Sequence, residues 1–196
     1  MFRKLLNSEL GRPDIEEYRH LKKSPVTVVL DNVRSRHNIG SAFRTCDAFR
    51  VSELILCGIS STPPAPEIHK SALGAEFSVE WKYCPSTEDA VRRLKAEGYT
   101  VMGVEQTENS ISTDRFLNGE ISLSPDRKYA VIFGNEVHGI SQEVVDLCDC
   151  TLEIPQYGTK HSLNVSVAVG IVLYVLGKGL DQQTATGSSD PYSQTV

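Results

Sequence analysis

The sequence has no long apolar run, and its most hydrophobic stretch is too short to cross a membrane. That stretch, Leu163 to Leu176, covers 14 residues and contains Asn164 and Ser166, whereas a bilayer-spanning helix needs about 20 apolar residues. The chain of 196 residues has five scattered cysteines, which excludes a disulfide scaffold and favours a reducing compartment. No charged and then apolar leader opens the chain. We therefore expect a cytoplasmic protein.

Positive charge is also scarce. The chain has 20 Lys and Arg against 25 Asp and Glu, a net charge of -5, which argues against a protein that coats nucleic acid. The bases are unevenly distributed, however: residues 19–50 carry a net charge of +5 and the rest of the chain carries -10. Such a basic segment predicts a focused phosphate-binding site, with a solvated basic face as the alternative.

Three common cofactor and metal motifs are missing. The first predicted strand runs into residues 31–34, DNVR, instead of a glycine-rich turn, which disfavours a standard Rossmann cofactor site. Residues 134–141 have the two glycines of a phosphate loop, but Ile140 replaces the essential lysine. Cys148 and Cys150 are one residue apart, and no histidine pair has ligand spacing, so no metal is expected.

Short β-branched apolar runs alternate with stretches of helical spacing. The predicted strands are 26–30, 53–57, 78–83, 99–105, 129–133 and 151–154, and the predicted helices are 38–49, 67–73, 87–97, 142–147 and 162–176. This alternation predicts an α/β fold, a mostly parallel sheet with helices on both faces, and ligands at the carboxyl ends of its strands. Residues 25–180 would form this domain, residues 1–24 a helical N-terminal extension, and residues 181–196 a disordered tail.

The segment 38–44, NIGSAFR, predicts a helix start that faces a ligand. Asn38 is a good N-cap, and the small residues after it leave the first-turn amides open. A phosphate could bind there beside Arg34, Arg36 and His37, because helix N-termini bind anions.

Arg44 belongs to the same segment. It lies four residues after Gly40, so the two share a helix face and Arg44 is expected to overlook an uncluttered surface. In the alternative, Arg44 pairs with Asp47 at helical spacing.

Residues 134–139, GNEVHG, directly follow a predicted strand. Two glycines on either side of Glu136 describe a tight loop that presents backbone amides and one charge to a ligand. Glu136 could orient an arginine or a hydroxyl. The alternative is a plain connecting turn.

Residues 154–166 form the third segment of interest. A strand ends at Ile154, a polar loop follows, and Ser162 and Asn164 open an apolar helix. Ser162 is a candidate N-cap. Asn164 is more informative, because an amide at the start of so apolar a helix needs hydrogen-bond partners.

In this order and spacing, the three segments resemble the SPOUT class of RNA methyltransferases, and within it the TrmH (SpoU) family of ribose 2'-O-methyltransferases. The resemblance covers residues 24–178 and rests on NIGSAFR, IFGNEVHGIS and EIPQYGTKHSLNVSVA. It implies an α/β domain whose carboxyl-terminal part threads through a loop as a trefoil knot, a rare exception to the rule that chains do not thread loops. It also implies a homodimer and S-adenosyl-L-methionine bound in the knot.

The resemblance also assigns catalytic residues, and the matching positions are Asn38, Arg44, Glu136, Ser162 and Asn164. Our hypothesis for their roles is that Asn38 positions ribose or phosphate and that Glu136 orients Arg44 or a loop amide. Ser162 and Asn164 would hold the knot and the reacting centre. Arg44 is either the base for the ribose 2'-hydroxyl or a clamp on the adjacent phosphate, since a free guanidinium stays protonated up to a pH of about 12.

The same resemblance implies where the methyl donor binds. Backbone groups and an apolar wall around the adenine would come from Gly134, Ile154 and Leu163. No metal ion is implied. The RNA backbone would lie across the basic segment, on Arg34, Arg36, His37 and Arg44.

Two observations favour tRNA as the RNA. No added RNA-binding domain of the kind seen in many ribosomal-RNA members precedes residue 24, and residues 98–107, GYTVMGVEQT, resemble members that act on the D-loop guanosine of tRNA. Ribosomal RNA is the alternative substrate. Two further interpretations stay open: a non-catalytic RNA-binding scaffold, and a methyltransferase that acts on a small molecule or a protein.

Overall fold

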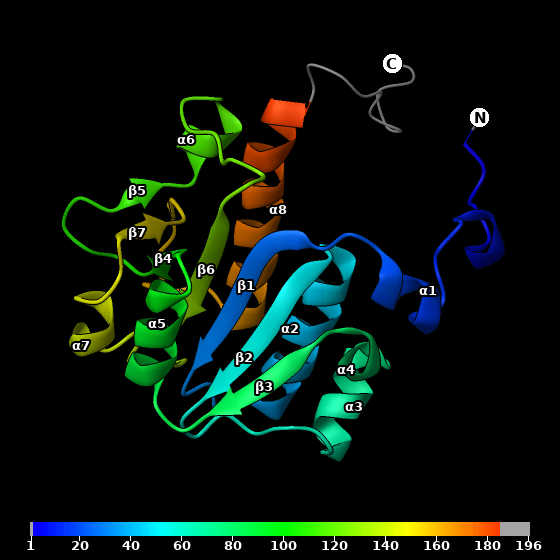
Figure 1. Cartoon of the computed structure of the whole chain (residues 1–196), viewed down its shortest axis with the longest axis horizontal. Helices are drawn as coiled ribbons and strands as arrows, with labels where there is room; N and C mark the ends of the chain where they lie inside the picture. The colour runs from blue at the N-terminus through cyan, green and yellow to red at the C-terminus, as the bar shows by residue number, and fades with distance from the viewer. Residues whose placement is uncertain (1, 185–196) are drawn as a thin grey trace.

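The computed structural model describes residues 2–184. Its centre is a seven-stranded sheet with the order β3-β2-β1-β6-β4-β7-β5, in which every pair of neighbours is parallel (Figure 1). The predicted α/β fold with a parallel sheet is therefore confirmed. The strands are β1 Ser24–Asp31, β2 Val51–Cys57, β3 Trp81–Cys84, β4 Tyr99–Val104, β5 Ile111–Ser112, β6 Lys128–Phe133 and β7 Cys150–Glu153.

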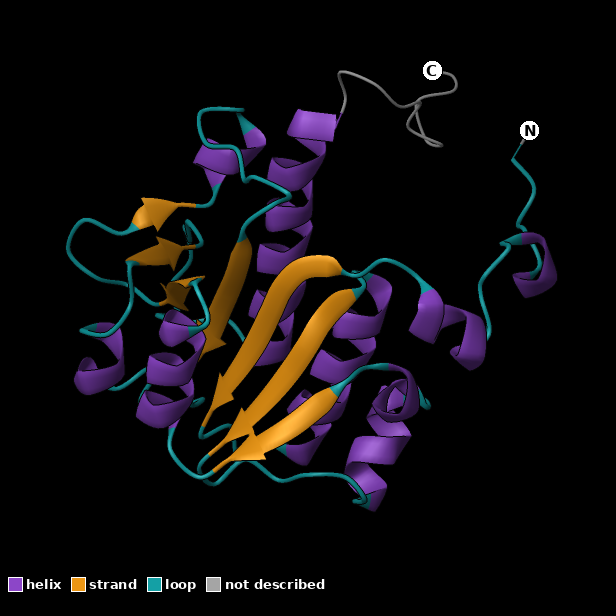
Figure 2. Ribbon diagram, viewed as in Figure 1, coloured by secondary structure: helices purple, strands orange, loops and turns teal. Residues whose placement is uncertain are grey.

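Helices cover both faces of the sheet (Figure 2). They are the 3-10 helix Asn7–Glu9, α1 Ile15–His20, α2 Arg36–Ala48, α3 Pro66–Ala72, α4 Ala75–Ser78, α5 Thr87–Ala96, α6 Asp114–Leu117, α7 Gln142–Val145 and α8 Val165–Thr184. The larger hydrophobic cluster joins the sheet to α2, α3, α4, α6 and α8, and the smaller one joins it to α5 and α7. None of the helices in residues 2–184 is both long and apolar enough to span a bilayer.

The burial of the central strands explains why the sequence folds this way. Along β1, Val28 and Leu30 pack in the larger cluster and Val29 in the smaller one, because successive side chains of a strand point to opposite faces. A strand that is buried on both faces needs a continuous apolar run, and β1 and β6 have one.

Several predicted boundaries were wrong. Ser78 closes α4, so β3 begins at Trp81 and not at residue 78, and β5 and α6 were not predicted at all. Helix α8 spans Val165–Thr184 and not the predicted residues 162–176. The rest of the predicted tail, residues 185–196, lies outside the described residues. The predicted trefoil knot stays a prediction.

Candidate functional site

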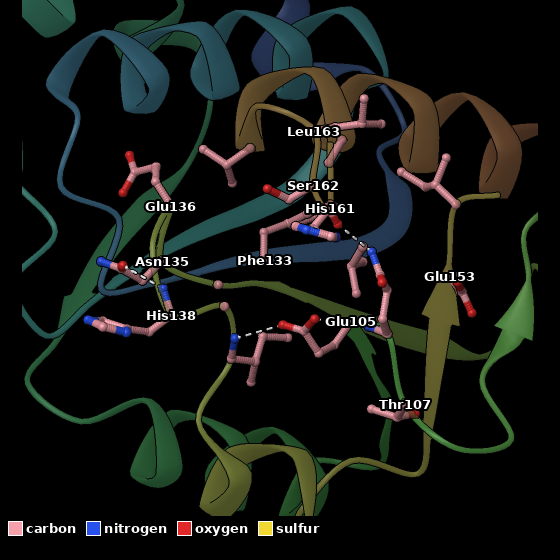
Figure 3. A pocket seen from close by; sticks show the side chains of 18 of the residues that line it. Glu105, Thr107, Phe133, Asn135, Glu136, His138, Glu153, His161, Ser162 and Leu163 are labelled. Carbon is pink, nitrogen blue, oxygen red and sulfur yellow. Dashed lines mark hydrogen bonds between the residues drawn. The ribbon is translucent and has the colours of Figure 1, made fainter. Parts of the chain in front are cut away.

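A cavity of about 470 Å³ lies at the carboxyl ends of β4, β6 and β7. Its lining comes from the segments that directly follow these strands, residues 105–107, 134–140 and 154–163, and from the start of α8. Figure 3 shows Glu105, Glu136 and Ser162, one from each of the three segments, around the cavity. The predicted ligand-binding edge of the sheet is therefore where the structure has its cavity, as expected for a parallel sheet.

The loop after β6 is a tight hairpin-like turn. Asn135 and Gly139 exchange two backbone hydrogen bonds of 3.0 and 2.9 Å, and Gly139 has a positive φ of 66°. A Cβ atom on Gly134 would collide with the backbone of Gly139 and Ile140. The two glycines are thus required by the close approach of the two arms of the turn, and the turn carries Glu136 at its exposed tip.

The carboxylate of Glu136 is held by donors from the far end of β1. It accepts hydrogen bonds from the backbone N–H groups of Arg34 and Ser35, both 3.0 Å, and from Nδ2 of Asn38, 3.1 Å. Partial burial by itself raises the pKa of Glu136, but these donors favour the charged form more strongly and hold the pKa below its ordinary value. Glu136 is therefore a carboxylate at neutral pH.

The hydrogen bonds continue from Asn38 to the third segment. Nδ2 of Asn164 donates to Oδ1 of Asn38, 3.1 Å, so Glu136, Asn38 and Asn164 form one chain of side-chain hydrogen bonds. The Oδ1 atom of Asn164 accepts from the backbone N–H and the hydroxyl of Ser166, 2.9 and 2.7 Å. Asn164 thus caps α8 and finds the partners that its position required. We call Glu136, Asn38 and Asn164 the carboxylate–amide relay.

The relay corrects three expectations about helix starts. Helix α2 begins at Arg36, and its cap is Ser35, whose side chain accepts from Asn38 N, so Asn38 is not the N-cap. Glu136 occupies the anion position at this N-terminus where we expected a phosphate. The cap of α8 is Asn164 and not Ser162, because the helix starts two residues later than the Ser162 cap predicts.

Arg44 does not join the relay. It is exposed and lines a second cavity of about 560 Å³, together with Arg12 and Arg50. Within residues 2–184 the Arg44 side chain has no ion pair, so the alternative interpretation, pairing with Asp47, is wrong. Asp47 instead accepts a hydrogen bond from Ser78.

The surface beside Gly40 is not open either. A Cβ on Gly40 would collide with Ser71 and with the carbonyl of Ile68, because α2 packs closely on α3 at this point. Gly40 is therefore needed for helix packing. Among the other predicted phosphate contacts, Arg36 forms an ion pair of 3.1 Å with Glu67, whereas the side chains of Arg34 and His37 are exposed.

The predicted donor-binding residues Gly134, Ile154 and Leu163 all line the first cavity, and so does Ser162. Sequence reasoning missed four residues of this cavity that hold its walls by hydrogen bonds: Glu105, Gln106, Asn135 and His161. The sequence offered a signal for two of them: Gln106 and Asn135 lie one and two residues after the ends of predicted strands, and the carboxyl ends of parallel strands bind ligands.

The chain is similar to known RNA methyltransferases. The sequence profile of the SpoU rRNA Methylase family matches residues 25–174. A tRNA (guanosine(18)-2'-O)-methyltransferase of Thermus thermophilus is 32% identical over 167 residues, which span 85% of this chain and 81% of that enzyme.

Two solved structures share the fold. The TrmH/SpoU tRNA modifying enzyme of A. aeolicus superimposes with a TM-score of 0.74 and 25% identity, over 87% of this chain and 82% of that one. An AdoMet-bound rRNA methyltransferase of Sinorhizobium meliloti gives a TM-score of 0.70 and 27% identity, over 81% of this chain and 59% of that one.

Proposed function

The chain belongs to the SpoU rRNA Methylase family, and from this premise we propose that it transfers a methyl group from S-adenosyl-L-methionine to a ribose 2'-hydroxyl of RNA, with tRNA as the favoured substrate. The observation that carries the proposal is the carboxylate–amide relay. It joins the three separate segments of the family resemblance, two of which, residues 134–139 and 154–166, contribute lining residues to the first cavity.

The cavity fits the methyl donor. Its volume of about 470 Å³ is in the range of small-molecule sites. Leu152, Leu163 and Val165 supply an apolar surface for the adenine, and the carboxylates of Glu105 and Glu153 supply negative charge for a cation. When bound, S-adenosyl-L-methionine supplies an electrophilic methyl group on a sulfonium.

The chain's own residues orient the hydroxyl. Glu136 stays ionised and fixes the backbone of Arg34 and Ser35, so we assign it the role of holding a loop amide and not of orienting Arg44. Asn38 and Asn164 keep their carboxamides in one orientation by bonding to each other. The Ser162 hydroxyl has no hydrogen bond within residues 2–184 and lines the cavity, so it is available to the ribose.

We assign Arg44 the role of phosphate clamp. Arg44, Arg12 and Arg50 line the second cavity, and within the described part of the chain none of the three forms an ion pair. Unpaired guanidiniums favour the phosphates of an RNA backbone. A general base, by contrast, would have to lie at the reacting hydroxyl, and Arg44 does not line the donor cavity of its own chain.

We also propose that the protein is a homodimer. Helix α8 leaves Val167 and Tyr174 about half exposed, 49% and 51%, and residues seven apart share one helix face. Exposed apolar side chains on one face mark an interaction site. Light scattering during gel filtration should give twice the chain mass, and a Val167→Asp variant should give the chain mass.

The cytoplasm is the compartment that we propose. All five cysteines are free thiols, and burial raises the pKa of Cys57 to about 12 and that of Cys148 to about 11, so these thiols resist deprotonation and oxidation. A protein without disulfides suits a reducing compartment.

The test is transfer of labelled methyl from S-adenosyl-L-methionine to total tRNA and, separately, to ribosomal RNA, followed by nuclease mapping of the product. We expect label in tRNA ribose with the wild type, its loss with Asn164→Ala, and reduced label with Arg44→Ala that higher RNA concentrations restore. Label in ribosomal RNA alone would change the substrate and keep the reaction. No label in either pool, or in unmodified precursor RNA, would overturn the proposal in favour of the non-catalytic scaffold.

A further inference from the structure

The three residues after β4 reach three different segments around the donor cavity. Glu105 bonds to the loop after β6, Gln106 to the loop before α8, and Thr107 to β7. We infer that Gln106 is a positioning residue for the methyl donor. Its side chain holds the cavity wall formed by residues 155–163, while the hydrogen bonds of Glu105 and Thr107 fix the backbone on either side of it. The inference rests on the proposed function.

The loop that Gln106 holds is otherwise weakly attached. Residues 155–163 form no helix or strand, and residues 156–163 are exposed. The Nε2 atom of Gln106 donates to the His161 carbonyl, 2.7 Å, and the corresponding dashed line ends beside the His161 label in Figure 3. This is the one hydrogen bond to residues 155–163 in the described part of the chain.

The held residues matter because they line the cavity. The next two residues after His161 are Ser162 and Leu163, which contribute a hydroxyl and an apolar side chain to the donor cavity. Asn164 then caps α8 and joins the relay. The Gln106 bond thus ends three residues before a fixed point, and it determines how far Ser162 and Leu163 can move.

Glu105 fixes the opposite wall. Its Oε2 accepts from Ile140 N, 3.0 Å, and its Oε1 from Gln106 N, 2.9 Å. A Cβ atom on Gly139 would collide with this carboxylate, so the glycine is what lets Glu105 approach the loop. The carboxylate therefore links the loop after β6 directly to the backbone of Gln106.

Thr107 secures the third side. Its hydroxyl lies 2.5 Å from that of Thr151 in β7, and β7 leads to Ile154 and into the loop that Gln106 holds. Gln106 is thus the single exposed side chain in a run that is fixed on both sides. Its substitution loosens one wall and leaves the other contacts in place.

The physical consequence is a cost in donor affinity. A loop that is ordered before binding loses less conformational freedom when the donor binds. Without the Gln106 bond, the donor must order residues 155–163 itself, which weakens its binding and leaves the transfer step at saturating donor nearly unchanged. A KM effect without a kcat effect is the signature of lost uniform binding.

The variant to test is Gln106→Met, which keeps the length of the side chain and removes the N–H donor. We expect the Kd for S-adenosyl-L-methionine, measured by calorimetry without RNA, to rise about fivefold, and kcat at saturating donor to stay within about twofold. Gln106→Glu, which also lacks the donor, should raise the Kd at least as much. The matched control is Glu108→Gln, whose exposed side chain has no hydrogen-bond partner within residues 2–184.

A second measurement needs no donor. In the free protein, trypsin should cleave after Lys160, which lies exposed in this loop, faster in Gln106→Met than in the wild type and the Glu108→Gln control. Equal cleavage rates, or an unchanged Kd in a protein whose wild type binds the donor, overturn the inference and leave the proposed function intact. A wild type that does not bind S-adenosyl-L-methionine overturns the proposed function instead, and the positioning role with it.

Discussion

The two ends of helix α2 both carry groups that can bind an anion, but within the part of the chain that the structure describes these groups have partners at the N-terminal end and none at Arg44. At its N-terminus, the backbone donors of Arg34 and Ser35 are already taken by Glu136, and Asn38 is bonded on both sides. Six residues beyond Asn38, Arg44 lines a cavity with Arg12 and Arg50, and none of these guanidiniums forms an ion pair in the described chain. The polar groups at the N-terminal end are thus bonded within the protein, whereas the guanidinium of Arg44 is unpaired among the described residues.

The difference indicates two kinds of contribution to the reaction. Groups that are hydrogen-bonded before the substrate arrives keep a fixed geometry, and their value lies in orientation, which salt hardly affects. Unpaired charges near the surface attract phosphate, and their value lies in affinity, which salt screens. The relay end should therefore control kcat, and the arginine end should control RNA affinity and its salt dependence.

The largest expected effect comes from the relay end. Glu136→Gln keeps the shape of the side chain and replaces one acceptor oxygen with an NH₂ group that faces backbone N–H donors. We expect kcat to fall about a hundredfold, since a displacement of about 1 Å in a positioned group has that effect. The RNA affinity and its salt slope should stay near those of the wild type.

The control for this variant is Glu143→Gln. Glu143 is exposed on α7 and has no hydrogen bond or ion pair in residues 2–184, so the same charge change there should leave kcat within about twofold. A Glu136→Gln enzyme with normal kcat and weakened RNA binding would reverse the comparison between the two ends.

A smaller effect is expected at the arginine end. Arg44→Ala should raise the Kd for RNA about tenfold at physiological salt and lower the slope of log K against log salt by about one unit, because one phosphate contact is lost. Donor affinity should not change. Filter binding over a salt series measures both quantities.

Two further variants sharpen this prediction. Arg44→Lys keeps a positive charge and should retain most of the RNA affinity, whereas Arg127→Ala, at an exposed position before β6, should match the wild type. If Arg44→Ala bound RNA normally and had no turnover at saturating RNA, Arg44 would be a base or an orienting group, and the clamp assignment would be wrong.

The sequence predicts the fold well where local pattern and burial agree. Runs of β-branched apolar residues identify β1 and β6, because both strands are buried on both faces. Strand β5 has two residues, too few for any periodic signal, and it exists only through its pairing with β7. The helix predicted over 162–176 exists, but both of its ends differ from α8. Its start was wrong because Ser162 and Asn164 were both candidate caps, and Asn164 also has a tertiary partner in Asn38.

The sequence predicted which residues belong to the site but not the hydrogen bonds between them. Glu136, Asn38 and Asn164 were all candidates, yet the bonds between them span about a hundred residues or more and leave no local pattern. Arg44 was grouped with Asn38 because both lie in one motif. Six residues along a helix separate them by about 9 Å and turn them to different faces.

The smallest expected effect is on the free energy of unfolding, and it tests only the N-terminal end of α2, where Glu136 is bound. The donors around Glu136 hold its pKa in the folded protein below the ordinary value, and an unfolded glutamate titrates near pH 4.3. Folding therefore favours the charged form. The resulting stabilisation is complete above about pH 5 and is lost as the pH falls through the lower, folded pKa.

Urea unfolding of the wild type and Glu136→Gln at several pH values between 7 and 3 measures this contribution. Because Glu136 is exposed, we expect a modest difference of about 1 kcal/mol in the free energy of unfolding at pH 7. The difference should shrink below about pH 4, since a protonated Glu136 resembles glutamine, and Glu143→Gln should show no such trend. A difference that stays constant to pH 3 would mean that the donors of Arg34, Ser35 and Asn38 recognise the shape of the side chain and not its charge. The N-terminus of α2 would then lack the bound anion on which its contrast with the arginine end depends.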